Sequence, residues 1–301
     1  MTLTLQANAK INLGLRITGR IAPAPDLRGE ELYVGHHTLH TLFQEIDFGD
    51  RITLEEDPSG KITLEVTGPY ADAIPSDETN LCLQAAGLFE EEAGIHDGVQ
   101  IHLKKHIPPG AGLGGGSSDA ATVLRGLNLL WKRGRRWDQL EQLAGQLGAD
   151  VPFFVRGGLQ LGEGIGELLT PLAARLPHHV VLVMLPFGVD TAWAYGQFAA
   201  RKIFPEPPAF DQLIMQDPIP WEAFTNDFEA VVFPRHPELG AIKAALLAAG
   251  AVWAGLSGSG STVAGLFDSP PNIRNLDQQF PDCHVVLANM IGGAEHNLDS
   301  T

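Results

Sequence analysis

The spacing of hydrophobic residues predicts that the chain begins with a series of strands. Apolar and polar residues alternate there with a period of two, which is typical of a half-buried strand. Residues 20–35 interrupt this alternation with several Pro and Gly and predict a surface loop. We therefore expect a strand over 3–15, a strand and a turn over 36–50, strands over 51–56 and 61–67 joined by a turn at 57–60, and a strand over 99–107.

Helical spacing, with apolar residues every three or four positions, appears further along the chain. Asn80 and Asp190 precede two such stretches and are typical N-cap residues, whereas Gly148 and Gly250 end two others. Helices are expected over 81–92, 120–131, 138–147, 191–201 and 237–250, and residues 226–229 are expected inside a further helix.

The second half mixes strands with helices. A hairpin that crosses between two domains is expected over 157–172, and the five prolines of 202–220 predict a loop. The order strand–helix–helix–strand–strand–helix–strand, without internal repeats, indicates an α+β half. Its strands are expected over 180–185, 252–254, 263–267 and 283–290.

Composition and charge limit the classes of function. A chain of 301 residues can bury a large core and is expected to form two domains. Its 36 acidic and 20 basic residues give a net charge of −16, which argues against a protein that binds the nucleic-acid backbone. A phosphorylated small molecule is still compatible with this charge, because it needs only a local positive site.

The sequence shows neither a targeting signal nor a cysteine framework. The first residues lack a basic segment followed by an apolar run, and no apolar run is long enough to cross a bilayer. Cys82 and Cys283 lack metal-site spacing, so both are expected to be buried thiols in a reducing compartment. We expect a cytoplasmic protein with no membrane partner, and the sequence leaves the oligomeric state open.

The most informative stretch is the glycine-rich segment 108–121, PPGAGLGGGSSDAA. A predicted strand precedes it and a predicted helix follows, so its glycines fill a strand-to-helix turn. Without Cβ atoms the backbone N–H groups can approach a ligand closely. The following helix adds free N–H groups and the positive end of its dipole at Ser117–Asp119. This combination suits a phosphate.

Three other interpretations of this segment fit the sequence less well. A flexible connector would not have a sharp strand before it and an amphipathic helix after it. Gly110, Gly112 and Gly115 satisfy the pattern G-x-G-x-x-G, but a dinucleotide site would need a second strand that ends in an acidic residue after the helix. A Walker loop is excluded, since no Lys follows the last glycine.

Two charged residues interrupt apolar stretches of the sequence. Lys10 lies within the first predicted strand, where it is costly unless it faces a cavity or a partner charge; the alternative is an edge strand with Lys10 in water. Asp150 separates a predicted helix from the apolar residues 151–154, and the alternative there is an ordinary capping or turn Asp. Paired across a cleft, each charge would offset the desolvation cost of the other.

Two further patterns resemble a catalytic motif and a metal site, but neither is complete. Residues 255–259 nearly match the nucleophile elbow G-x-S-x-G, but Ser259 stands in place of the last glycine, which argues against a serine hydrolase. His36 and His40 share one face of a predicted strand and His37 lies on the other, so no metal site is predicted from their spacing.

The glycine-rich segment resembles the phosphate-binding motif of the GHMP kinase superfamily, P-x-x-x-G-L-G-S/G-S-S-A/D-A. Other blocks resemble one branch of that superfamily, in the same order and over nearly the whole chain: AKINL at 9–13, HTLHTLFQ at 37–44, LGADVPFF at 147–154, EGIGE at 163–167, NDFE at 226–229 and LSGSGS at 256–261. The resemblance implies a small-molecule kinase of isoprenoid biosynthesis. Its substrates would be ATP, with Mg²⁺, and a cytidylyl diphosphate sugar alcohol whose hydroxyl is phosphorylated.

The resemblance also implies a fold. It is the α+β, two-domain GHMP kinase fold, with the active site in the cleft between the domains. Residues 1–165 would form the ATP-binding N-terminal domain, a ribosomal-protein-S5-like α/β domain. Residues 166–301 would form the C-terminal domain, a ferredoxin-like α+β domain.

By the same resemblance, Lys10 and Asp150 are the catalytic pair and Asn12 lies beside the substrate. His37 would contact the cytosine end, and His36 stands where the family has a tyrosine that stacks on the base; an imidazole stacks with less area. Ser117 or Ser118 would lie near Mg²⁺, without a set of protein metal ligands, and the loop 257–261 would close against the phosphates. The residues expected to bind the nucleotide are Pro108, Pro109, Gly110, Ala111, Gly112, Leu113, Gly114, Gly115, Gly116, Ser117 and Ser118.

Two alternatives stay open at this point. One is another GHMP kinase that acts on homoserine, mevalonate or galactose. The other is a non-catalytic relative that binds nucleotide and serves as a regulator. The presence of both Lys10 and Asp150 argues against the second alternative.

Overall fold

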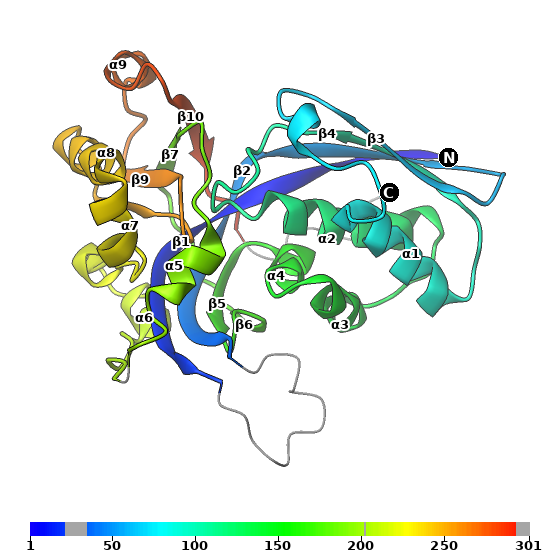
Figure 1. Cartoon of the computed structure of the whole chain (residues 1–301), viewed down its shortest axis with the longest axis horizontal. Coiled ribbons are helices and arrows are strands. Elements are labelled where there is room, and N and C mark those ends of the chain that lie inside the picture. Colours follow the sequence, from blue (N-terminus) through cyan, green and yellow to red (C-terminus); the bar gives the residue numbers. More distant parts are fainter. Residues whose placement is uncertain (22–34, 202, 293–301) are drawn as a thin grey trace.

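Two long antiparallel strands, β1 (Thr2–Arg20) and β2 (His37–Glu56), form the central structural unit of the molecule (Figure 1). The computed structural model describes residues 1–21, 35–201 and 203–292, so most of the predicted loop at 20–35 lies outside the described residues. The predicted turn within 36–50 is wrong, because β2 continues through it. The extra residues of β2 form a bulge where the register shifts between Asn8 and Ala9.

The first half builds one mixed sheet around this pair, in the order β3-β4-β2-β5-β6 with β1 alongside β2. The strands β3 and β4 are parallel, and the other pairs are antiparallel. The predicted hairpin at 157–172 is present as β5 and β6, but it stays within this sheet. The added strands are β3 (Ile62–Thr67), β4 (Val99–Lys104), β5 (Leu159–Glu163) and β6 (Leu168–Pro171).

Helices cover one face of this sheet (Figure 1). Asn80 caps the first of them as predicted, since its side chain accepts a hydrogen bond from the Cys82 amide. The helix after the glycine-rich segment starts at Gly115, two residues before the N-terminal end expected at Ser117–Asp119, so the last glycines belong to its first turn. The helices are α1 (Leu81–Ala93), α2 (Gly115–Leu130), α3 (Trp137–Leu147) and α4 (Val151–Arg156), and Ala71–Ala73 forms a short 3₁₀ turn.

The second half contains an antiparallel sheet in the order β10-β7-β9-β8. Apart from His179 at its start, the strand β7 is apolar, and both of its faces are buried. Val180 and Leu182 pack with Ile11 of β1, whereas Val181 belongs to the core on the other face of the sheet. The strands are β7 (His179–Met184), β8 (Trp253–Leu256), β9 (Val263–Phe267) and β10 (His284–Asn289).

The helix predicted over 191–201 is shorter than expected, whereas the one predicted over 237–250 is present and ends at Ala248. Asp190 caps its helix as expected, by accepting a hydrogen bond from the Trp193 amide, but that helix already ends at Gly196. Asn226 lies outside any helix because its amide group binds backbone atoms of neighbouring loops. The helices are α5 (Thr191–Gly196), α6 (Phe210–Leu213), α7 (Glu229–Arg235), α8 (Pro237–Ala248) and α9 (Ile273–Gln279), and Trp221–Ala223 forms a 3₁₀ turn.

Sheet membership changes between Pro171 and His179, so β6 lies with the first half; a division of the chain into domains at residue 165 stays a prediction. Within the described residues, no helix has the length and apolar character needed to span a membrane. Cys82 is a buried free thiol, as expected, and Cys283 is a half-buried one.

Candidate active site

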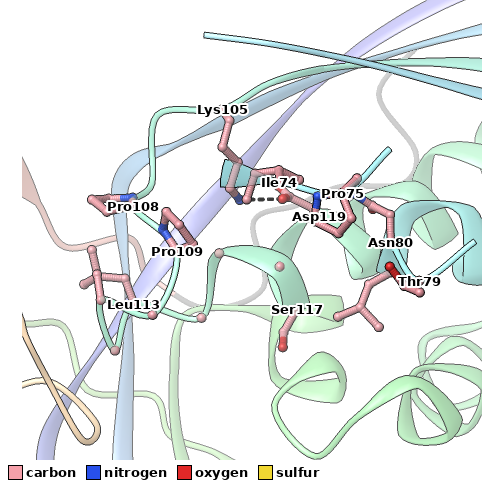
Figure 2. A pocket seen from close by; sticks show the side chains of 17 residues that line it. Ile74, Pro75, Thr79, Asn80, Lys105, Pro108, Pro109, Leu113, Ser117 and Asp119 are labelled. Atoms are coloured by element: carbon pink, nitrogen blue, oxygen red, sulfur yellow. Dashed lines mark hydrogen bonds and ion pairs between the residues drawn. The ribbon is translucent and has the colours of Figure 1, made fainter. Parts of the chain in front are cut away.

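The glycine-rich segment forms one wall of a cavity of about 400 Å³, which we call the glycine-loop cavity (Figure 2). All of 108–117 line it, as do the turn before α1 and the end of the strand before the segment. The other lining residues are Ile74, Pro75, Thr79, Asn80, Leu81, Lys105 and Asp119.

The backbone of this segment explains its glycines. Gly112 has a φ of 78°, and a Cβ there would lie 2.1 Å from the Ser257 carbonyl oxygen, so only glycine fits. Gly114 has a φ of 72° and is the N-cap of α2. Because glycine has no side chain, the first amides of α2 are left without a capping group and are open to a ligand. Together with the helix dipole they favour an anion.

The two serines of the first turn of α2 differ in their surroundings. The Ser118 hydroxyl is buried and donates a 2.6 Å hydrogen bond to the Asn8 carbonyl oxygen, which anchors α2 to β1. A contact of the Ser118 side chain with nucleotide or Mg²⁺ therefore does not fit this geometry. Ser117 lines the glycine-loop cavity and also the larger cavity next to it.

A buried charge cluster, which no local sequence pattern indicates, lies beside the glycine-loop cavity. Lys105 Nζ lies 2.5 Å from Asp119 Oδ2, a contact that Figure 2 shows, and 2.5 Å from Asp50 Oδ2. Asp50 also accepts hydrogen bonds from the amides of His106 and Ile107. The cluster therefore ties the start of the glycine-rich segment to the first turn of α2.

The charges of this cluster do not balance, because one ammonium faces two carboxylates. Burial raises the pKa of Asp119 to about 7; Lys105 opposes this shift and Asp50 adds to it. Asp119 is therefore a carboxyl group that changes its charge near neutral pH.

The larger cavity, of about 800 Å³, contains the predicted histidines, and we call it the histidine cavity. The rings of His37 and Tyr195 stack there, with centroids 5.4 Å apart. His37 Nε2 is buried and has no partner among the described residues. Burial lowers the pKa of His37, and the nearby Arg20 lowers it further, so the imidazole is neutral at pH 7. The other lining residues are Gly35, His36, Leu39, Ser117, Ala149, Asp150, Ile165, Thr191, Ala192, Gly196 and Ala199.

A third, smaller cavity of about 130 Å³ has Lys10, Asn12 and Asp150 in its wall, and we call it the lysine cavity. Lys10 is only 4 % exposed, so the alternative that places its side chain in water is wrong. Burial lowers the pKa of Lys10, and the charge of Asp150 opposes that shift. The Lys10 ammonium lies 5.4 Å from the centroid of the Phe43 ring.

Asp150 stands at the N-cap of α4, yet in the described structure its side chain makes no capping hydrogen bond. The interpretation as a capping residue is therefore wrong. Asp150 lines both the lysine cavity and the histidine cavity. Gly112 and Gly114 line both the lysine cavity and the glycine-loop cavity. Ser117 is common to the glycine-loop and histidine cavities, so each pair of the three cavities shares lining residues.

The loop 257–261 of the second half packs against the glycine-rich segment and β1. Ser257 Oγ donates a 2.9 Å hydrogen bond to the Gly112 carbonyl oxygen, and the Thr262 amide donates to that of Ala111. The Gly258 amide donates to Asn12 Oδ1. Gly258 and Ser259 also line the lysine cavity, so both halves contribute to it.

Tyr195 is a lining residue that was not among those expected from the sequence. It lines both the histidine and the lysine cavity, and its ring also contacts Phe228 edge-on. Burial raises the pKa of its hydroxyl, and the charge of Asp150 raises it further. The sequence predicts a helix at Tyr195, but no local pattern indicates that this helix faces His37.

The chain matches the family models described as GHMP kinases N terminal domain, over residues 80–158, and GHMP kinases C terminal, over residues 209–282. It is 45 % identical to a 4-diphosphocytidyl-2-C-methyl-D-erythritol kinase from Chlorobium luteolum, over 83 % of each chain. The enzyme of the same name from Chloroherpeton thalassium is 40 % identical, over 83 % of this chain and 84 % of that one. The chain belongs to this family of GHMP kinases.

Solved structures agree with this family. A crystal structure of 4-(cytidine 5'-diphospho)-2C-methyl-D-erythritol kinase is 34 % identical and has a TM-score of 0.76, covering 97 % of this chain and all of that one. The mevalonate kinase of Methanococcus jannaschii, at 15 % identity and a TM-score of 0.67, shares the fold. The expected two-domain α+β fold of a small-molecule kinase is therefore confirmed.

Substitution of Gly116 tests the glycine-loop cavity. A Cβ at this position would meet only Leu81 Cδ1, at 3.7 Å, so Gly116→Ala fits the fold and places its methyl group at the cavity wall. A Gly→Ala change inside a helix stabilises a protein by about 0.5–1 kcal/mol. We expect thermal stability to rise slightly while the KM for ATP rises about tenfold or more, since the methyl group prevents close approach of a phosphate.

Gly145→Ala is the matched control, because a Cβ at Gly145 in α3 would meet no atom within 4 Å. It should stabilise the protein in the same way and leave the KM for ATP unchanged. An unchanged KM for ATP in Gly116→Ala as well would show that this helix end does not hold the nucleotide.

The raised pKa of Asp119 predicts a pH-dependent stability. The folded state binds a proton at Asp119 that the unfolded state has already released, so this group stabilises the fold at low pH. That contribution falls as pH rises from about 4 to 7, by up to about 1.4 kcal/mol per pH unit. Urea unfolding should therefore show that Asp119→Asn gains stability relative to wild type across this window. As a control, Asp277→Asn changes an exposed carboxylate, and its unfolding free energy should depend on pH as that of wild type does. The same pH dependence in Asp119→Asn would contradict the prediction.

Proposed function

We infer that the chain transfers the γ-phosphate of ATP to the 2-hydroxyl of 4-diphosphocytidyl-2-C-methyl-D-erythritol, giving the 2-phosphate and ADP in the non-mevalonate route to isoprenoids. The observation that supports this most is the junction of the three cavities, where Lys10 and Asp150 lie between a glycine-rich cavity and a histidine-lined one. The relatives named above carry this substrate in their names.

The nucleotide belongs in the glycine-loop cavity. Amides of the first turn of α2 would bind its phosphates, and the helix dipole would add to their attraction. Mg²⁺ would enter with ATP and keep most of its water ligands. Ser117 is the hydroxyl that lies where the nucleotide and acceptor cavities meet.

The acceptor belongs in the histidine cavity, with its cytidylyl end at His37. The buried, unpartnered His37 Nε2 needs a hydrogen-bond partner, and the edge of a cytosine offers both donors and acceptors. The aromatic surfaces of His36, His37 and Tyr195 suit a planar base. The methylerythritol end would then extend toward Asp150, which lines the same cavity.

The reaction needs positioning and charge stabilisation more than covalent chemistry. Asp150 would accept the proton of the 2-hydroxyl while that oxygen forms a bond to the γ-phosphorus and the bond to the β-phosphate oxygen breaks. Lys10 would stabilise the charge on the transferring group and keep Asp150 ionised. The low polarity around Lys10, which is buried beside Phe43, strengthens both interactions.

The direct test is a coupled ADP-release assay with the purified chain and Mg-ATP. We expect turnover of 4-diphosphocytidyl-2-C-methyl-D-erythritol with a kcat/KM at least about 100-fold above those of homoserine, mevalonate and galactose, because a site built for a cytosine leaves buried polar groups unpaired when the base is missing. Faster turnover of one of the three other alcohols would overturn the assignment.

Lys10 and Asp150 should act as one unit. General-base catalysis contributes about 10²–10⁴-fold, so Asp150→Asn and Lys10→Ala should each lower kcat on that order. The double variant should lose far less than the product of the two losses, because residues that act together are not additive. Equilibrium binding of ATP to Asp150→Asn should be retained. Losses that multiply in the double variant would mean that the two residues act separately.

A further inference from the structure

We propose that Asn12 is a positioning residue that holds the Lys10 ammonium and links it to the loop 257–261 of the second half. It does this in place of the direct substrate contact that the family resemblance implies. The proposal rests on the proposed function, because it concerns the orientation of the lysine that acts on the transferred phosphate. The observation that supports the proposal is that the Asn12 side-chain amide already makes hydrogen bonds to three groups of the protein.

The hydrogen bonds of Asn12 reach both halves of the molecule. Its Oδ1 accepts from Lys10 Nζ at 2.6 Å and from the Gly258 amide at 2.9 Å. Its Nδ2 donates to Thr41 Oγ1 at 2.8 Å, and Asn12 is only 1 % exposed. Both lone pairs of Oδ1 are used and one N–H is left, so the side chain has little capacity and little surface for a substrate.

The orientation of this amide follows from the chemistry of its neighbours. The Thr41 hydroxyl donates to the Gly14 carbonyl oxygen at 2.8 Å, so it faces Asn12 with a lone pair and requires a donor there. Lys10 Nζ and the Gly258 amide can only donate, so they require an acceptor. A flipped Asn12 would lose all three hydrogen bonds, and its orientation is therefore fixed without ambiguity.

The loop 257–261, to which Asn12 connects, is also held in place by hydrogen bonds. Asn226 Nδ2 donates to the carbonyl oxygens of Gly258 and Leu256, at 2.8 Å each. Gly258 is therefore fixed on one side by Asn226 and on the other by Asn12. A Cβ at Gly258 would lie 3.5 Å from Lys10 Nζ, so the loop also packs beside the ammonium itself. The position of Lys10 thus depends on residues from both halves of the chain.

The charged groups around Lys10 explain why a neutral acceptor is useful. Asp150, at the start of α4, acts on Lys10 by its charge, and the Tyr195 hydroxyl of α5 lines the same cavity. From β2, Glu45 stands opposite Lys10 in the register, but its carboxylate accepts from Asn8 and from the Gly158 amide. The loop 257–261 brings no ionisable side chain. Asn12 Oδ1 therefore orients the ammonium without neutralising it, so its charge remains available to a phosphate.

The test compares Asn12→Ala and Asn12→Asp with wild type in kcat, in both KM values and in the pH profile of kcat. Lys10 must be protonated to act, so the alkaline limb of that profile follows its ionisation. Loss of the acceptor in Asn12→Ala should lower kcat about 10–100-fold and move the alkaline limb to lower pH by about one pH unit, since a hydrogen bond to a charged group is lost. The added carboxylate of Asn12→Asp should move the limb to higher pH.

Two further variants control for general damage to β1 and β2. Asn8→Ala removes another buried asparagine of β1, whose side chain binds Glu45; it should leave the alkaline limb in place. Thr41→Val removes the group that orients Asn12 while preserving its own shape, and it should shift the limb in the same direction as Asn12→Ala but less. Its effect should vanish in the Asn12→Ala background.

The Lys10 ionisation can also be followed without turnover, by NMR of the chain labelled at the lysine ε-carbon, with Lys10→Ala to assign the signal. A wild type that does not phosphorylate the cytidylyl acceptor would refute the proposed function, whereas these NMR shifts would still test Asn12. An Asn12→Ala variant that raises the KM for the acceptor and leaves both the alkaline limb and the Lys10 signal unchanged would make Asn12 a substrate ligand and overturn the proposal.

Discussion

The burial of the Lys10 ammonium is the constraint on which the rest of the site depends. A charge that is 4 % exposed must find acceptors and opposite charge inside the protein, because water is excluded. Asn12 supplies the acceptor, Asp150 the opposite charge and Phe43 a ring face. These groups come from β1, β2 and the start of α4, so the cost of one buried charge determines how several elements must be placed.

The distance along the sequence between interacting residues determines which parts of the site the sequence predicts. Local patterns identify the glycine-rich segment, the caps at Asn80 and Asp190 and the two misplaced charges, Lys10 and Asp150, since each depends on residues close in the sequence. The long-range partners are different. The contact of Lys105 with Asp50 and the stacking of His37 on Tyr195 join residues 55 and 158 positions apart, and no local period encodes them.

Errors in the predicted strands and helices have equally physical causes. Asp47 and Gly49 together are typical of a turn, yet β2 continues there because a bulge accommodates the extra residues opposite Asn8. The residues around Asn226 predict a helix there, whereas its side chain donates a hydrogen bond that holds the loop at Gly258. In both places tertiary contacts overrule a local preference, and both lie on elements that shape the candidate site.

The two-sided burial of β7 limits how this kinase can admit its substrates. One face of β7 packs on β1, the strand that carries Lys10, and the other face packs in the core of the second half. A hinge rotation between the halves would open an apolar interface and pull Gly258 away from Asn12. Access that keeps this interface closed requires local movements at the rims of the cavities, such as α5, whose Tyr195 stacks on His37.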